Sequence, residues 1–350
     1  MDATAQRTHF TAAAADFEGF TDEATVCARL ARAGFTRVAV PTSAAAFELG
    51  TLCAAREALA YRSGMADGVL AVLGLGCQPL LAAGTDEQRA RWVHPVAAGT
   101  AACGFALTEP EAGSDVAAMA TSARRDGDGW MLDGKKTFIS NAPIADWFVL
   151  FARTEVGPTA FVVERGDPGV RIDADVPLSV PHPIGSVVLD GARLPAGRQV
   201  GAEGAGIKLA LGTLDAFRTS VGAAACGMAQ RAFDEALAHV KRRRQFGKAL
   251  AEFQLTQARL ADMAVDLAAA RALVEQACAA RTRLNVAIAK LYATEAAQRV
   301  IDSAVQLFGG LGVMRGNVVE ELYREVRALR IYEGTSEIQK LIIARELLRG

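Results

Sequence analysis

The stretch DGDGWMLDGKKTFIS (126–140) decides the fold class of this 350-residue chain. It holds Asp-Gly pairs at 126–127, 128–129 and 133–134, and a further pair lies at 190–191. Asp-Gly between apolar runs is the strongest short hairpin signal, because tight hairpin turns need positive φ. We therefore predict antiparallel strands in GWMLDGKKTFIS, WFVLFART, TAFVVERG and SVVLDGARL. The absence of βαβ alternation argues against a parallel nucleotide-binding sheet.

The regions on both sides of these strands carry a helical period instead. TDEATVCARLARAG (21–34) and TDEQRARWVHPVAAG (85–99) begin with acidic residues and end at Gly. We predict an α+β protein with an N-terminal helical domain (1–102), a central antiparallel β barrel or sandwich (103–202) and a C-terminal helical bundle (203–350). The bundle stripes are Leu260, Met263, Leu267, Ala270, Val274 and Ala277, then Ala289, Ala293, Ala296, Val300, Ala304 and Leu307.

The composition allows a large core and shows no bias toward nucleic acid or membranes. Hydrophobic residues make up 51% of the chain, charged residues make up 22%, and the formal net charge is −1. The charge is uneven: residues 1–202 carry 17 Lys+Arg against 23 Asp+Glu, and residues 203–350 carry 21 against 16. The C-terminal part therefore mildly favours an anionic small ligand.

The cysteines and the apolar stretches predict a cytoplasmic protein. Six cysteines lie far apart with no C-x-x-C pair, which is typical of buried, reduced thiols. The N-terminus lacks the basic start and apolar run of a signal peptide. GVLAVLGLGCQPLLAAG (68–84) contains Gln78 and Pro79, and we expect it to be too short and interrupted to span a bilayer.

Several common kinds of active site are excluded because the sequence motifs that they require are absent. GGLGVMRG (309–316) follows a helical pattern and spaces its third glycine wrongly for a Rossmann loop. There is no Walker loop and no G-x-S-x-G elbow, and the four histidines show no metal spacing. KRRRQFGK (241–248) fits a solvated helix end better than a nucleic-acid patch when taken alone.

RIYEGTSEIQK (330–340) places Glu333 between apolar residues and a Gly-Thr-Ser turn. Thr335 or Ser336 can cap the helix that follows. Taken alone, an acid here is explained by the favourable helix dipole.

Five motifs in order resemble the acyl-CoA dehydrogenase family. The resemblance covers roughly residues 85–350, and residues 21–84 more weakly. It implies an N-terminal helical domain, a central β domain and a C-terminal four-helix bundle, as the periodicity predicts independently. The motifs are GFALTEPEAGSD (104–115), FISNA (138–142), RRQFGKALAEFQ (243–254), QLFGGLG (306–312) and IYEGTSEIQKLIIAREL (331–347).

The resemblance implies FAD as the cofactor, lying between the β domain and the bundle. Backbone groups and the Thr108 hydroxyl would bond the pyrimidine edge of the isoalloxazine, and Phe138 would shield one side of the ring. Arg243 and Gln245 would reach the FAD of a neighbouring subunit. The implied cofactor contacts are Phe105, Leu107, Thr108, Gly113, Ser114, Phe138, Ile139, Ser140, Arg243, Gln245, Phe253, Gln254, Gln306, Leu307, Gly309, Gly310, Thr335 and Glu337.

Glu333 coincides with the family's catalytic base. Some members carry the base on the helix that holds LDAFR (214–218), but Phe217 stands there and cannot accept a proton. The resemblance implies that Glu333 takes the pro-R α-proton of an acyl thioester while a hydride leaves the β-carbon for flavin N5. The backbone N–H of Glu333 and a ribityl hydroxyl would bond the thioester carbonyl. The implied substrate contacts are Ser114, Asp215, Phe217, Arg218, Gly334 and Arg345.

The resemblance also implies roles for the residues on either side of Glu333. We expect Ile331 and Tyr332 to exclude water and raise the basicity of the carboxylate. We expect Gly334 to let the backbone approach the substrate closely, and Thr335 to turn back to the cofactor.

Three departures put the substrate in doubt. The chain is short for the family, and the usual first helix is reduced to the poorly patterned TAAAADFEG (11–19). The family's Pro-then-Gly-Gly segment is VPTSAAAFELG (40–50), and the loop around ARTRLN (280–285) is trimmed. These changes leave the flavin chemistry intact but permit a short acyl group or one held by a carrier protein.

Other functions on the same scaffold remain open. An acyl-CoA oxidase is generally longer, and a flavin monooxygenase does not need Glu333. A non-catalytic FAD- or DNA-binding member carries extra C-terminal helices, whereas this chain stops at ARELLRG. The expected partners are an acyl-CoA or acyl-carrier-protein thioester and an electron acceptor such as an electron-transfer flavoprotein. We expect a homodimer or homotetramer, with no metal, nucleic acid or membrane.

Overall fold

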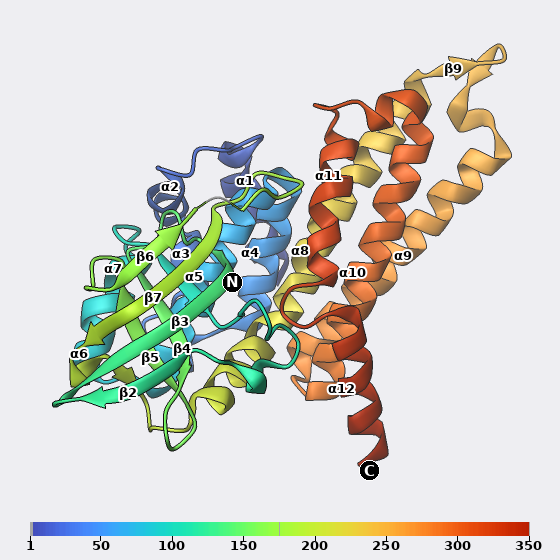
Figure 1. The fold of residues 1–350 in the computed structure, drawn as a ribbon. Coiled ribbons are helices and arrows are strands. Elements are labelled where there is room, and N and C mark those ends of the chain that lie inside the picture. Colours follow the sequence, from blue (N-terminus) through green and yellow to red (C-terminus); the bar gives the residue numbers. More distant parts are fainter. Residues whose placement is uncertain (1–2, 175, 350) are drawn as a thin grey trace. The chain divides into compact units, whose positions relative to one another are not determined.

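The computed structural model describes residues 3–174 and 176–349. The chain divides into two compact units, which are described separately. The sheet unit comprises Thr21–Glu48 and Gly68–Ala216. The bundle unit comprises Met1–Phe20, Leu49–Asp67 and Phe217–Gly350. Figure 1 shows the course of the chain.

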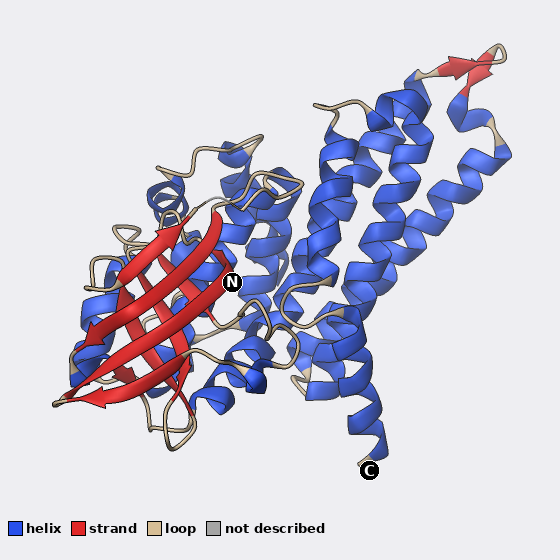
Figure 2. Ribbon diagram, in the orientation of Figure 1, coloured by secondary structure: helices blue, strands red, loops and turns tan. Residues whose placement is uncertain are grey.

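The sheet unit is built around one sheet, and within the described residues it has eight strands. The order is β6-β7-β3-β2-β4-β5-β8, with β1 beside β4. The strands are drawn in red in Figure 2. The four predicted strand segments all form. The bounds are β1 Cys103–Ala106, β2 Ser122–Asp126, β3 Gly129–Ser140, β4 Trp147–Arg153, β5 Pro158–Glu164, β6 Val170–Asp173, β7 Ile184–Leu194 and β8 Gln199–Val200.

Two predictions about this sheet need correction. The sheet is mixed rather than purely antiparallel, because β4 runs parallel to both β1 and β2. The Asp-Gly pairs also differ in role: the turn between β2 and β3 uses 126–129, but Asp133-Gly134 lies inside β3 and Asp190-Gly191 inside β7. The register between these strands shifts there, and the Gly191 N–H donates to Asp133 Oδ1 at 2.7 Å. An Asp side chain that bonds backbone can serve a bulge as well as a turn.

One apolar cluster joins the strands of this unit. Trp130, Phe148 and Phe161, from β3, β4 and β5, are buried in it together with Val187 of β7. Short helices accompany the sheet: α2 Val26–Arg32, α3 Phe35–Ala39, α6 Asp86–Gln88, the π-helical turn Arg89–Val93 and α7 His94–Ala97. The longer helix α5 Gly64–Ala83 belongs to this unit from Gly68 onward. Thr85 caps α6 in a full capping box with Gln88.

The bundle unit consists of long helices with alanine-rich contact faces. Its predicted stripes are buried, and Leu260 and Leu307 are partly buried. Alanine lets helices approach closely, and glycine does so further: a Cβ at Gly227 of α8 would lie 2.1 Å from the Glu57 carbonyl of α4. The bounds are α1 Ala3–Ala14, α4 Leu49–Arg62, α8 Gly206–Arg242, α9 Gln254–Ala279, α10 Arg283–Phe308, α11 Val318–Val326 and α12 Ser336–Leu348. A small hairpin, β9 Arg244–Gln245 and β10 Lys248–Ala249, joins α8 to α9.

Two expectations about the N-terminal third are wrong. A first helix does form, over Ala3–Ala14, because alanine-rich segments have high helix propensity even without a clear apolar stripe. The apolar stretch is also not too short, since Pro79 is accommodated within the 20-residue α5. Of the described helices, α5 alone is long and apolar enough to cross a membrane, and 78% of its most apolar window is buried inside the protein.

Candidate active site

The Glu333 turn is held by buried side chains from two helices of the bundle unit and from α12. Glu333 has φ 52° and Gly334 has φ 92°, both in the left-handed region. Arg218 Nε of α8 donates to the Glu333 carbonyl at 2.9 Å. Lys290 Nζ of α10 and Gln339 Nε2 of α12 donate to the Gly334 carbonyl at 2.9 Å and 3.0 Å. An unusual backbone conformation persists where its surroundings determine it, and here two successive carbonyls are bound.

The roles of Lys290 and Gln339 at this turn were not predicted from the sequence. The position of Lys290 in an apolar helical stripe could have indicated such a role. Lys290 stands in the buried alanine stripe of α10, between Ala289 and Ala293, and is itself fully buried. Burial lowers the pKa of Lys290 to about 8, while the Glu333 carboxylate acts in the opposite direction. A lysine in such a stripe needs a partner inside the protein.

Gly334 has a more specific role than the predicted close approach to a substrate. A Cβ there would lie 2.7 Å from Gln339 Nε2 and 3.3 Å from an Arg218 nitrogen. Any side chain would therefore push away two of the groups that hold the turn. Glycine is also the residue that adopts φ 92° without strain.

The Glu333 carboxyl group is placed to act as a base. Its Oε2 atom is buried and has no hydrogen-bond partner among the described residues. The pKa of Glu333 is raised, because burial disfavours the charged form more than Arg56, Lys290 and Arg218 favour it. A carboxylate that is desolvated and unpaired binds a proton more readily than one in water.

Arg56 and Asp67 form a buried ion pair in the same unit, which sequence analysis missed. Arg56 Nε and Nη2 each donate to an Asp67 oxygen at 2.8 Å, and Nη1 donates to Ser220 Oγ at 2.8 Å. Both charged side chains are almost completely buried. Asp67 thus neutralises the charge of Arg56, which is the neighbouring cation that acts most strongly to lower the pKa of Glu333.

One expectation about the Glu333 segment needs correction. Tyr332 exposes 37% of its surface and Ile331 exposes 54%, so these residues do not exclude water by themselves. Of the two residues that could cap the following helix, Thr335 does so, and its Oγ1 accepts from the Ile338 N–H at 3.3 Å. Ser336 instead donates to Glu295 at 2.6 Å. The Thr335 hydroxyl therefore serves the helix, and its contact with the cofactor stays a prediction.

In the sheet unit, the structure brings together the ends of β1 and β3. The Thr137 N–H donates to the Thr108 carbonyl at 2.9 Å. Lys136 Nζ, fully buried, donates to the Leu107 carbonyl at 3.2 Å and to Glu109 at 2.7 Å. Glu109 also accepts from the Ala120 N–H at 2.6 Å. Glu109 and Lys136 are therefore positioning residues for the loop after β1, and their role was not predicted.

This loop and the end of β3 offer a surface for a flat ring. Phe138 has φ 53° and exposes 60% of its surface, whereas Ile139 beside it is buried. Gly113 and Ser114 are exposed, and a Cβ at Gly113 would meet open space. An exposed aromatic side chain next to the Thr108 loop suits stacking and edge bonding of an isoalloxazine.

Several of the predicted cofactor-binding residues lie far from Glu333 within the bundle unit. Lys290 contacts Gly334, and Gln306 lies sixteen residues further along the same helix, so about 24 Å separates them at 1.5 Å per residue. The Arg243–Gln245 hairpin follows the far end of α8 (Figure 1). Gly309 and Gly310 there have open space at their Cβ positions.

Other predicted substrate- and cofactor-binding residues differ in how far they are buried. Phe217 is fully buried, Asp215 is half-buried, and Arg345 and Glu337 are exposed on α12. Arg218 is the one that contacts the Glu333 turn directly. Within the described residues, no group of three or more His, Cys, Asp or Glu side chains could hold a metal ion.

Comparison with known proteins decides the family. The chain matches the model of the acyl-CoA dehydrogenase N-terminal domain over residues 3–100, the middle domain over 104–191 and the C-terminal domain over 204–348. The chain belongs to the acyl-CoA dehydrogenase family. The N-terminal match begins at residue 3, so the departures at 11–19 and 40–50 are local changes within a domain that is present.

Similar family members include both reductases and dehydrogenases. A 3-(aryl)acrylate reductase of Clostridium sporogenes is 39% identical over 77% of this chain and 75% of its own length. A probable acyl-CoA dehydrogenase, fadE25, of Mycobacterium bovis is 37% identical over 94% and 88%. The CarC subunit of a caffeyl-CoA reductase-Etf complex of Acetobacterium woodii is 36% identical over 77% and 75%.

Solved structures of family members share the whole fold. The chain is 31% identical to butyryl-CoA dehydrogenase of Megasphaera elsdenii, with a TM-score of 0.92 over 100% of this chain and 99% of the other. A glutaryl-CoA dehydrogenase of Mycobacterium smegmatis in complex with FADH2 gives a TM-score of 0.94 at 26% identity, over 100% and 95%. This acyl-CoA dehydrogenase is thus an FAD-dependent oxidoreductase acting on CH–CH bonds, and the exposed Phe138 and the open glycines fit that cofactor.

Proposed function

We propose that this acyl-CoA dehydrogenase interconverts an acyl thioester and its α,β-enoyl thioester with Glu333 as the acid–base residue. The observation that carries the proposal is the buried, unpartnered Glu333 Oε2 on a turn whose carbonyls are bound by Arg218, Lys290 and Gln339. These three side chains donate to backbone carbonyls of the turn, and Oε2 has no hydrogen-bond partner among the described residues. Removing an α-proton requires such a base close to the thioester.

The steps assigned to this chain concern one proton. Glu333 accepts the α-proton, and its raised pKa keeps the acquired proton on the carboxyl group. The Glu333 backbone N–H is proposed to bond the thioester carbonyl, which gains negative charge as the proton leaves. FAD, when bound, supplies the two-electron acceptor for the β-hydrogen. In the reductive direction Glu333 returns the proton, so one residue serves both directions.

The Glu333→Gln variant tests the proposal. Glutamine keeps the size of the side chain but cannot accept a proton, and the donors to the turn bind carbonyls, so folding and FAD content should survive. Flavin reduction by the best acyl thioester, followed by stopped-flow absorbance, should slow by roughly 10²–10⁴-fold. Glu321→Gln, which changes an exposed glutamate of α11, is the control and should reduce its flavin at the wild-type rate. A Glu333→Gln rate within a few-fold of wild type would refute the assignment.

We propose acyl-CoA as the carrier form and leave acyl-carrier-protein thioesters as the alternative. The support is that several similar proteins are named for CoA thioesters. Anaerobic flavin bleaching with matched short-chain and long-chain panels of both carriers decides this point. Strong preference for a long-chain acyl-CoA would argue against the short or carrier-borne acyl group that the local changes in the N-terminal domain favour.

We propose an electron-transfer flavoprotein as the redox partner, because CarC is the subunit of an Etf complex. Electron transfer from the substrate-reduced enzyme to a purified electron-transfer flavoprotein should be fast in the absence of oxygen. Peroxide release at the rate of substrate turnover in air would instead favour an oxidase.

A further inference from the structure

Two cysteines from distant parts of the sequence face each other in the bundle unit. Cys278, near the end of α9, donates from its thiol to Cys53 Sγ of α4 at 3.6 Å. A disulfide needs about 2.05 Å between the sulfurs, so small side-chain movements separate this contact from a bond. The two residues are 225 positions apart in sequence.

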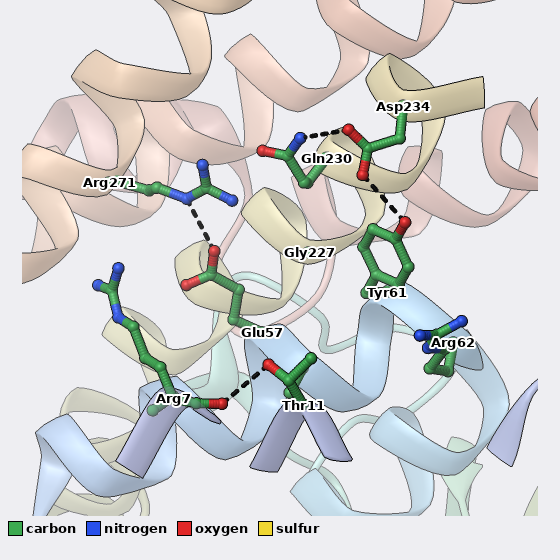
Figure 3. A pocket seen from close by; sticks show the side chains of 11 residues that line it. Arg7, Thr11, Glu57, Tyr61, Arg62, Gly227, Gln230, Asp234 and Arg271 are labelled. Atoms are coloured by element: carbon green, nitrogen blue, oxygen red, sulfur yellow. Dashed lines mark hydrogen bonds and ion pairs between the residues drawn. The ribbon is translucent and has the colours of Figure 1, made fainter. Parts of the chain in front are cut away.

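Ion pairs already hold the backbone around these thiols in register. Glu57, one turn after Cys53, accepts from Arg271 Nε of α9 at 2.8 Å. Arg7 of α1 donates to Glu275, one turn before Cys278, at 2.6 Å. Figure 3 shows Arg7, Glu57 and Arg271 around one pocket of about 400 Å³. The Glu57–Arg271 pair joins α4 to α9, so the two helices that carry the sulfurs are already in contact.

The two thiols differ in a way that assigns separate roles. Cys53 is buried, whereas Cys278 is only partly buried and can meet a small oxidant from solvent. The pKa of Cys278 is lowered, first because the Cys53 thiol can bond its thiolate, and also because Arg281 and Arg7 are nearby. The same hydrogen bond raises the pKa of Cys53, which keeps its proton. Because Cys278 is the more accessible of the two, it is the thiol that meets the oxidant first, and Cys53 is the resolving thiol.

We propose that Cys278 and Cys53 form a peroxide-responsive dithiol that closes into a disulfide between α9 and α4. The Cys278 thiolate attacks one peroxide oxygen, the O–O bond breaks, and the departing hydroxide takes a proton to become water. Cys53 sulfur then attacks the Cys278 sulfenic acid, the S–O bond breaks, and the second water carries away the Cys53 proton. Two thiols are oxidised by two electrons, and one hydrogen peroxide is reduced to two waters.

The chain provides an internal control in its other close thiol pair. Cys77 and Cys103 of the sheet unit have their sulfurs 3.8 Å apart. Both are fully buried, and the Cys103 thiol also contacts the Leu73 carbonyl. The distance between the sulfurs is therefore similar in the two pairs, but only the Cys53–Cys278 pair has a thiol that solvent can reach. Oxidation confined to Cys53 and Cys278 would show that access and thiolate formation, not proximity alone, select the pair.

The experiment uses the FAD-bound enzyme, hydrogen peroxide, and peptide mapping by mass spectrometry without reduction. Wild type should lose two free thiols, gain one Cys53–Cys278 crosslinked peptide within single chains, and recover both thiols with dithiothreitol. Its melting temperature should rise on oxidation, because a crosslink closing so long a loop restricts the unfolded chain.

Two variants make the result decisive. Cys53→Ser should leave Cys278 as a sulfenic acid that dimedone traps, and Cys278→Ser should leave Cys53 reduced at the same peroxide concentration. The proposal is overturned if Cys53 oxidises equally in Cys278→Ser, if the disulfide joins two chains, or if Cys77 and Cys103 oxidise first. Unchanged wild-type thiols at peroxide levels that oxidise a free cysteine control would overturn it as well.

Discussion

Glu333 combines three properties that none of its neighbours in the chain has together. It has positive φ, a buried carboxylate oxygen without a partner among the described residues, and a backbone carbonyl that Arg218 binds. The positive φ and the bound carbonyl fix where the side chain points. The buried, unpartnered carboxylate oxygen sets its proton affinity. A glutamate in the exposed first turn of a helix has none of these constraints. Glu337, one turn further on, is such a residue, and its pKa is lowered by backbone and Thr335 hydrogen bonds.

The raised pKa of Glu333 predicts a pH-dependent cost to stability. A carboxyl group whose pKa is higher in the folded state favours folding fully below the unfolded value near 4.5 and loses that contribution as pH rises through the folded value. Glu333→Gln should therefore melt at a higher temperature than wild type at neutral pH, and the difference should vanish at pH 4 and below. Thermal scans from pH 4 to pH 8 check this, with Glu321→Gln as the control that leaves the profile unchanged.

The flavin reduction rate should follow the same ionisation. The rate should rise with pH through a single step above pH 4.5, because Glu333 must lose its proton before it can accept one from the substrate. Glu333→Gln should show no such step. A wild-type profile that is flat from pH 5 to pH 9 would contradict the assignment of Glu333 as the base.

Helices α4, α5 and α8 are joined by one buried polar network. Arg56 of α4 bonds Asp67 of α5 and Ser220 of α8, and Ser220 Oγ donates onward to the Phe217 carbonyl at 2.7 Å. An ion pair in such a place does not need to add stability, but removing one partner leaves a buried charge. The network therefore ties the three helices to each other through a small number of strong contacts.

Arg56→Met should destabilise the protein by roughly 3–5 kcal/mol, because Asp67 then stays buried without its cation. The double variant Arg56→Met/Asp67→Leu should recover most of that loss, since an apolar pair of similar volume carries no uncompensated charge. Urea unfolding with a matched FAD assay measures both. Equal or additive losses in the double variant would mean that the pair itself supplies net stability.

The assembly of the chain should couple to cofactor binding. Arg243 and Gln245 lie at the end of the bundle away from Glu333, and the hairpin that carries them exposes 94% of Phe246. Aromatic residues are enriched at protein–protein interfaces, so Phe246 is a candidate contact residue. About 24 Å along α10 separates Lys290, which contacts Gly334, from Gln306 near the hairpin end of the bundle. We propose a homo-oligomer in which the hairpin serves a neighbouring subunit's FAD.

Arg243→Ala should weaken FAD retention and assembly together, because one guanidinium would serve both. Light scattering coupled to gel filtration gives the mass, and flavin absorbance per chain gives the occupancy. Arg242→Ala, one residue earlier and also exposed, is the matched control and should alter neither. A monomeric Arg243→Ala protein that keeps its full FAD content would disprove the coupling.

The amino-acid sequence alone determined the division into helix, sheet and helix, the strand segments and the buried stripes of α9 and α10, because residue periodicity is local. Glu333 was identified as the candidate base only through the resemblance of five motifs to the acyl-CoA dehydrogenase family, since the acid taken alone is explained by the helix dipole. Tertiary structure decided the rest: the parallel pairings of β4, the Asp-Gly bulges in β3 and β7, and the cap at Thr335. It also revealed Lys290, Gln339, the Arg56–Asp67 pair and the facing Cys53 and Cys278. Each of these depends on which distant residue arrives opposite, and a buried lysine or thiol has no chemical role until its partner is in place.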